Sequence, residues 1–329
     1  MPDLLLQPRP EGLYCPAGGF YIDPAEPVAQ AVVTHAHGDH ARQGNARYHV
    51  ARAGLALMRE RLGEPALIDA YAYGEPFTLG EVRVSLHPSG HMLGAAQVRM
   101  EHAGRVVVVS GDYKREPDPT CAPFEPIPCE TFVTESTFAL PVYRWPPMAQ
   151  VIDELLAWWD DCVRRQVPAL LFCYALGKAQ RLLAELAPRI DRVVHLHGAL
   201  LRLTALYREA GVAMPPTQPL DEDARGAALA GELVLAPPSA AGSPWMRRFP
   251  TASTGFASGW MQIRGNRRRR GYERGFVVSD HADWNGLVRS VAQTGARRIY
   301  VTHGDGDALV RYLRERGHDA LPLASLEAS

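Results

Sequence analysis

The segment from Thr34 to His40 contains the residue types in this chain that are best suited to chemistry. It reads Thr-His-Ala-His-Gly-Asp-His and places His35, His37, Asp39 and His40 within a few residues of one another. Imidazole nitrogens and carboxylate oxygens suit zinc or a similar divalent ion. The alternative is a polar loop with incidental histidines, and the tight spacing disfavours it. We therefore predict a metal site that takes further ligands from elsewhere in the chain.

Short apolar runs precede most of the candidate residues. Ala31–Val33 leads into the histidine-rich segment, Arg105–Val109 leads to Asp112, and Thr131–Val133 leads to Glu135. Runs of this length and composition predict buried strands. Functional groups collect beyond the carboxyl ends of the strands of an open α/β sheet, so one site can gather them. The remaining candidates are His91 on a glycine-flanked loop, and His281 and His303 after two later predicted strands, Val277–Ser279 and Ile299–Thr302.

Asp23 ends the strand-like segment Phe20–Asp23, just upstream of the histidine-rich segment. A carboxylate at that point can orient a metal-bound histidine by hydrogen bonding to its second ring nitrogen. A turn-forming aspartate before Pro24 is the other interpretation, and the sequence leaves both open.

Length and charge limit the partners. The chain has 329 residues, with 35 basic and 36 acidic side chains, which favours two domains, or one domain with a large insert. With a net charge near zero, a nucleic acid would need a local basic patch. The five cysteines form no C-x-x-C pair, which indicates reduced thiols and a cytoplasmic protein. No apolar run approaches the roughly 20 residues of a spanning helix, so we expect no membrane partner.

The local basic patch is the run Arg267–Arg270 with the nearby Arg264. Clustered guanidinium groups can bind successive phosphates, and the neighbouring Trp260 can stack on a base. A solvated hairpin is the alternative interpretation of the run. The candidates for contact with nucleic acid are Arg264, Arg267, Arg268, Arg269, Arg270, Trp260 and Lys178.

The pattern of predicted elements changes after residue 140. Helical and strand-like segments alternate from 141 to 250, which predicts a small parallel sheet with helices on its faces. We expect this block to be an inserted domain between a first part, residues 1–140, and a second part, residues 251–329. The tryptophan and leucine positions of the block are interpreted as core.

These features together resemble the metallo-β-lactamase superfamily and, within it, the β-CASP nucleases. The likeness rests on Asp23, the His35–His40 segment, His91, Asp112, Glu135, His281, His303 and the insert segment Tyr174–Gln180. More narrowly, the chain resembles the bacterial ligase-associated DNA exonucleases. That likeness is carried by the segments Gly12–Cys15, Phe20–Pro24, Glu135–Phe138, Leu140–Trp145 and Ser279–Trp284.

The resemblance implies an α/β fold, a metallo-β-lactamase αββα sandwich with an inserted β-CASP α/β domain. It also implies two divalent metal ions, with Zn²⁺ favoured and Mn²⁺ as the alternative, that activate a water for phosphodiester hydrolysis. By similarity, one ion binds His35, His37, His91 and Asp112, and the other binds Asp39, His40, Asp112 and His303. Asp39 is also counted among the catalytic residues, with His281 as the general acid and Glu135 holding its imidazole.

The expected function is that of a DNA exonuclease in repair, acting on single strands or duplex ends beside an ATP-dependent DNA ligase and a helicase. An RNA-processing nuclease stays open, because the DNA-repair branch often has an apolar residue where this chain has His303. His303 could otherwise be an ordinary turn histidine. A small-molecule metallo-hydrolase shares the histidine core, and Glu135, His281 and the insert disfavour it. A scaffold without metals is disfavoured because every ligand position holds a metal-binding residue type.

Overall fold

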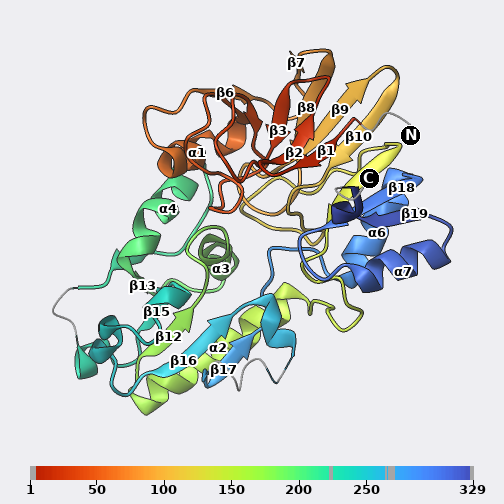
Figure 1. The fold of residues 1–329 in the computed structure, drawn as a ribbon. Helices are drawn as coiled ribbons and strands as arrows, with labels where there is room; N and C mark the ends of the chain where they lie inside the picture. Colours follow the sequence, from red (N-terminus) through yellow and green to blue (C-terminus); the bar gives the residue numbers. More distant parts are fainter. Residues whose placement is uncertain (1–4, 222–224, 264, 266–270, 327–329) are drawn as a thin grey trace. The chain divides into compact units, whose positions relative to one another are not determined.

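The structure is a computed structural model, and it describes residues 5–221, 225–263, 265 and 271–326. The chain divides into two compact units (Figure 1). The first comprises Met1–Tyr143 with His281–Ser329, and the second comprises Arg144–Asp280. In the part of the chain that is described, no helix is long and apolar enough to cross a membrane.

Two sheets form the first unit. The first sheet contains, in spatial order, β1 (Gln7–Arg9), β2 (Gly12–Cys15), β3 (Phe20–Ile22), β4 (Ala31–Val32), β5 (Tyr48–Ala51) and β6 (Ile68–Tyr71). The second contains β19 (Asp319–Pro322), β18 (Arg298–Thr302), β11 (Thr131–Glu135), β10 (Arg105–Val109), β9 (Ala96–His102), β8 (Val82–Pro88) and β7 (Pro76–Leu79). The helical segments are η1 (Arg52–Gly54), α1 (Leu55–Leu62), α6 (Trp284–Thr294), α7 (Asp307–Glu315) and η6 (Leu323–Leu326).

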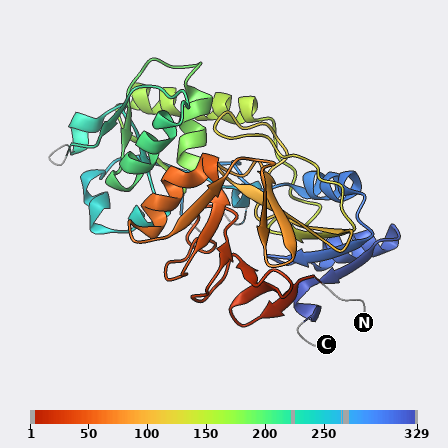
Figure 2. The same ribbon diagram turned by 90° about the horizontal axis from the view of Figure 1, so that it is seen from above.

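The two sheets share one core. Apolar residues of the first sheet, such as Phe20 and Val32, cluster with Val107 and Val109 of β10. Val108 faces the opposite way and joins a second core with residues of α6 and α7, because successive side chains of a strand point to opposite faces. Figure 1 and Figure 2 show α6 and α7, in blue, on the side of the second sheet that faces away from the first.

The parallel centre of the second sheet brings candidate residues to one edge. Strands β10, β11 and β18 are parallel neighbours, with Val109 opposite Val133 and Glu135 opposite Thr302. Their carboxyl ends therefore lie side by side. Asp112 follows β10, Glu135 ends β11 and His303 follows β18, so a single edge carries all three.

The second unit is a parallel sheet with helices. Its strands, in spatial order, are β14 (Thr217–Pro219), β13 (Val194–Leu196), β15 (Leu233–Ala236), β12 (Ala169–Phe172), β16 (Ser253–Ala257) and β17 (Arg274–Phe276). The helices are α2 (Met148–Arg165), α3 (Lys178–Leu186) and α4 (Gly198–Glu209), with shorter turns η2 (Gly226–Leu229), η3 (Pro238–Ala240), η4 (Pro244–Arg248) and η5 (Gly259–Gln262). Helices α2 and α3 pack on one sheet face, and Phe172 and Phe256 help to form a separate core on the other.

The sequence predicted most of these elements, and the structure differs in three places. The spacing of Leu55, Met58 and Leu62 predicts a helix over 51–62, and α1 occupies 55–62 of that range. The βα alternation of the insert and the core position of Trp158 and Trp159 are confirmed. The strand expected at 277–279 lies earlier, at β17. The sequence predicts another helix over 221–230, and the described part of that region holds only the turn η2. Strands β16 and β17 pair with β12, so the second unit extends to Asp280, whereas the sequence interpretation ended the insert at 250.

One glycine contact anchors the loop that carries His91. Gly94 follows His91 with φ +77°, and a Cβ atom at Gly94 would collide with the main chain of Gly54, which ends η1. Only glycine fits both the backbone conformation and the close approach. The loop is thereby held against the turn that precedes α1.

We expect Gly94→Ala to destabilise the protein far more than Gly104→Ala. Both glycines have φ +77°, but a Cβ at Gly104 would meet nothing within 4 Å. The control variant therefore carries only the left-handed backbone cost of about 1–2 kcal/mol, and the test variant adds a main-chain collision. Chemical denaturation of the two variants gives the comparison. Equal losses would show that the contact with Gly54 is easily relieved.

Candidate active site

Asp23 organises the histidine-rich loop after β4. Its Oδ1 accepts a hydrogen bond from the Thr34 main-chain N–H at 2.8 Å, and its Oδ2 accepts one from Thr34 Oγ1 at 2.6 Å. The same Oδ2 lies 2.8 Å from His40 Nδ1. Asp23 therefore holds both ends of the loop and leaves Nε2 of His40 facing the site, the orienting geometry expected of it.

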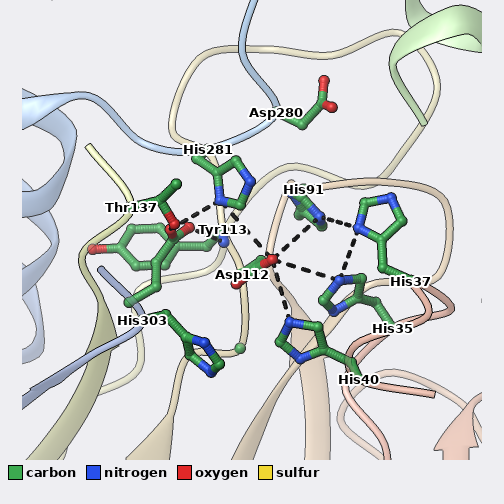
Figure 3. A network of polar contacts seen from close by, with 12 residues as sticks. His35, His37, His40, His91, Asp112, Tyr113, Thr137, Asp280, His281 and His303 are labelled. Atoms are coloured by element: carbon green, nitrogen blue, oxygen red, sulfur yellow. Dashed lines mark hydrogen bonds and ion pairs between the residues drawn. The ribbon is translucent and has the colours of Figure 1, made fainter. Parts of the chain in front are cut away.

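Four residues converge as a candidate metal-binding group: His35, His37, His91 and Asp112 each offer one ligand atom, and these atoms lie within 4.8 Å of one another (Figure 3). His37 Nδ1 is 3.1 Å from His35 Nε2 and 3.1 Å from His91 Nε2. Asp112 Oδ2 is 3.6 Å from His35 Nε2 and 3.7 Å from His91 Nε2. Three segments that are distant in the chain thus supply one cluster.

These separations fit a tetrahedral ion. Zinc–nitrogen bonds of about 2.0–2.1 Å in tetrahedral geometry put neighbouring ligand atoms about 3.3 Å apart. Burial, together with the neighbouring histidines His40, His91 and His37, lowers the pKa of His35 well below its ordinary value. A neutral imidazole is the form that binds a metal. The spacing of these ligand atoms and the lowered pKa of His35 therefore suit a zinc-like ion.

Asp112 also faces a second group. Its Oδ2 lies 3.5 Å from His40 Nε2, and Asp39 Oδ2 lies 3.8 Å from the same His40 nitrogen. The His303 ring is 5.2 Å from the His40 ring, centre to centre. Asp39 and His303 are exposed, whereas His40 and Asp112 are buried. The residues expected to form a second metal site are therefore two buried and two exposed side chains.

Charge around Asp112 keeps its carboxyl group ionised. Burial by itself would raise the pKa of Asp112, but His281, His40 and His35 together hold it well below its ordinary range. Burial would likewise lower the pKa of His40, and Asp23 and Asp112 hold it well above. The site is thus a network of charged and neutral groups around one carboxylate.

His281 and Glu135 form a separate pair beside Asp112. His281 Nδ1 lies 2.9 Å from Glu135 Oε2, and Glu135 is 1% exposed. If Nδ1–H donates to the carboxylate, this contact fixes the tautomer and the orientation of the His281 ring. The His281 side chain is 21% exposed, which is enough for its ring edge to meet a bound molecule.

Two residues that the sequence interpretation missed hold Glu135 in place. The Tyr113 main-chain N–H donates to Glu135 Oε1 at 2.7 Å, and Thr137 Oγ1 donates to Oε2 at 2.6 Å. Both are adjacent to predicted site residues, Tyr113 after Asp112 and Thr137 shortly after Glu135. That adjacency was the available signal, although nothing local indicates which residue their donors contact.

The structure describes two of the residues expected to contact nucleic acid, Trp260 and Lys178. Arg264 and Arg267–Arg270 lie outside the described residues. Trp260 is half-buried in η5 and packs against the core of the second unit. Lys178 is 5% exposed, and its Nζ is 3.0 Å from Asp280 Oδ2. Of the described candidates, then, one is a packing residue and the other is an ion-paired one.

Comparison with known proteins gives several relatives. The chain is 33% identical to a protein named probable DNA ligase from Opitutus terrae, over 94% of this chain and 30% of that protein. It is 30% identical to endoribonuclease ysh1 from Aspergillus fumigatus, over 47% of this chain and 18% of that protein. With ribonuclease TTHA0252 from Thermus thermophilus it shares 26% identity, over 59% of this chain and 49% of that protein. The chain therefore spans less than half the length of each of these relatives.

A solved structure supports the fold. The crystal structure of a protein of unknown function from Enterococcus faecalis V583 matches with a TM-score of 0.59 at 12% identity, over 84% of this chain and 75% of that one. No protein-family model matches the chain. The chain nevertheless belongs to the metallo-β-lactamase/β-CASP nuclease family, to which these relatives and the sequence motifs point.

We expect Zn²⁺ to stabilise the metal-free protein and His91→Ala to remove that effect. An ion that binds only the folded state adds on the order of 4 kcal/mol at roughly 1,000 times its dissociation constant. The measurement is the unfolding midpoint with and without Zn²⁺. His102→Ala is the control, because His102 is a half-buried histidine outside the site that pairs with Glu81. Equal Zn²⁺ stabilisation of both variants would contradict a ligand role for His91.

Proposed function

We propose that this protein is a metal-dependent phosphodiester hydrolase, specifically a DNA exonuclease that acts in repair. The observation that carries the proposal is that the candidate metal-binding histidines and the His281–Glu135 pair both lie next to the carboxylate of Asp112. Asp112 Oδ2 lies within 3.5–3.7 Å of His35, His40 and His91, and 4.0 Å from Nδ1 of His281, which Glu135 holds. A metal-binding group and a positioned proton donor side by side suit attack on a phosphate with departure of an alkoxide.

We propose two divalent ions per chain, with Zn²⁺ favoured over Mn²⁺. His35, His37, His91 and Asp112 would hold one, and Asp39, His40, Asp112 and His303 the other. When bound, such ions supply a nucleophile at neutral pH by lowering the pKa of a water, and they neutralise charge on the phosphate. The donor set supports this, because Asp112 has histidines from both groups on one oxygen.

The chain's own residues would act on the leaving group. His281 would give a proton from Nε2 to the departing sugar oxygen, while Glu135 holds the ring in one orientation through Nδ1. Tyr113 and Thr137 occupy the Glu135 oxygens with donors, so that the carboxylate cannot rotate freely. A proton donor held in this way typically contributes about 100- to 10,000-fold in rate.

DNA is favoured as substrate because similarity to a protein named probable DNA ligase extends over 94% of this chain. A nuclease that trims ends beside a ligase, and with a helicase that exposes single strands, is consistent with that likeness. The ribonuclease names of other relatives, and the histidine at 303, support the alternative of an RNA-processing nuclease. In this proposal, Arg264 and the run Arg267–Arg270 bind phosphates of the nucleic acid.

The four-layer αββα arrangement also belongs to the proposal. The two packed sheets with α6 and α7 on one outer face support it. Helix α1 contacts β5 of the first sheet and would supply the fourth layer.

The test of function is degradation of end-labelled single-stranded and duplex DNA and of matched RNA. We expect stepwise shortening of DNA from an end with Zn²⁺ or Mn²⁺, and no shortening after chelation. Preferential cleavage of RNA would favour the alternative. Absence of phosphodiester cleavage by protein with its metal content verified would refute the proposal.

We expect His281→Ala to lose about 100- to 10,000-fold in rate while keeping its metals and its substrate affinity. The loss should shrink on a nitrophenyl phosphodiester, because a leaving oxygen that is stable as an anion needs no proton. Rates on both substrates and elemental analysis provide the measurement. An equal loss on both substrates, or a lower metal content, would assign His281 to another role.

A further inference from the structure

Lys178 and Asp280 form a buried ion pair in the second unit. Lys178 is the first residue of α3, and its Nζ lies 3.0 Å from Asp280 Oδ2, with side chains only 6% and 5% exposed. The ammonium also lies 4.8 Å from the centre of the Tyr174 ring. Burial of both charges requires that each keep its partner, because removing one leaves the other uncompensated.

A second cation from the same helix holds the preceding residue. Arg181 lies one turn after Lys178 on α3, and its Nη1 donates to the main-chain oxygen of Ser279 at 2.7 Å. Residues three apart on a helix share one face. One face of α3 therefore fixes two consecutive residues, Ser279 and Asp280, and the next residue in the chain is His281.

The use of lysine in this chain sets Lys178 apart. Among 35 basic residues, only Lys114 and Lys178 are lysines, and the rest are arginines. Both lysines are buried. A lysine ammonium is a compact point charge, whereas a guanidinium is a wide planar fork. The buried contact with a single carboxylate oxygen suits the smaller group, and the burial disfavours a phosphate as its partner.

We propose that Lys178 and Arg181 are positioning residues that hold Ser279 and Asp280 and thereby set the placement of His281. The inference rests on the proposed role of His281 as proton donor. Glu135 fixes the imidazole from its Nδ1 side, and the α3 face fixes the main chain directly before it. Both restraints are needed, because a displacement of about 1 Å in a catalytic group can cost on the order of 100-fold in rate.

The test is a double-mutant cycle with Lys178→Met, Asp280→Asn and the double variant. The double variant leaves no buried charge without a partner, so it remains informative if a single variant does not fold. We expect each to lose about 10- to 100-fold in kcat on DNA with metal content unchanged, and the losses not to add. The control variant is Arg192→Met with Asp160→Asn. These two residues form an exposed ion pair of the same unit, also at 3.0 Å, and this variant should keep the kcat of the unaltered protein.

To distinguish a positioning role of Lys178 and Asp280 from a purely structural one, the double variant is made again in a His281→Ala background. If the pair acts through His281, the added substitutions change nothing further, and the loss on DNA is reduced on a nitrophenyl phosphodiester. A further drop in the His281→Ala background would overturn the inference. The salt dependence of DNA binding gives a second check. If Lys178→Met lowers the slope of the log binding constant against the log salt concentration by about 0.7–0.9, a phosphate contact has been lost and the inference is overturned.

The outcomes also separate this inference from the proposed function. If His281→Ala keeps its full rate on DNA, the proposed function loses its proton donor, and the positioning role falls with it. If His281→Ala is impaired and the Lys178→Met/Asp280→Asn variant is not, only the positioning role is refuted.

Discussion

The site depends on one carboxylate oxygen, Oδ2 of Asp112. Nitrogens of His40, His35, His91 and His281 lie 3.5, 3.6, 3.7 and 4.0 Å from it. Burial alone would favour the protonated acid, and the surrounding imidazoles reverse that preference. A buried anion is tolerable only with such partners. The histidines approach one another as closely as 3.1 Å, and His37 contacts both His35 and His91.

The fold keeps that cluster in place by close approaches of the main chain. Gly111, directly before Asp112, has φ +55°, and a Cβ there would lie 2.8 Å from Cβ of Thr34. Thr34 is itself bound twice by Asp23, which also holds His40. The loops after β4 and β10 therefore fit together as a rigid pair, as a preorganised site requires.

His281 is held differently from the metal-binding group. The imidazole of His281 contacts Glu135, a residue of the second sheet. The two residues before it, Ser279 and Asp280, contact Arg181 and Lys178 of α3.

The sequence by itself determined the residue types of the site and the elements that carry them. The spacing of His35 and His37 is local, and the strand-end positions of Asp112 and Glu135 follow from short β-branched runs, so both were predictable. Periodicity also predicted the helices of the insert. Its second boundary was not predictable, because β16 and β17 belong to it only through their pairing with β12.

Only the tertiary structure decided which partner each polar group has. The bonds of Asp23 to His40 and of Tyr113 to Glu135 join residues that are far apart in the chain. Lys178 at the start of a helix has the sequence signature of an exposed cation, and packing instead buries it against Asp280. Burial is a property of the whole fold: a local pattern specifies that a charge is present, but the surrounding elements decide whether water or a carboxylate neutralises it.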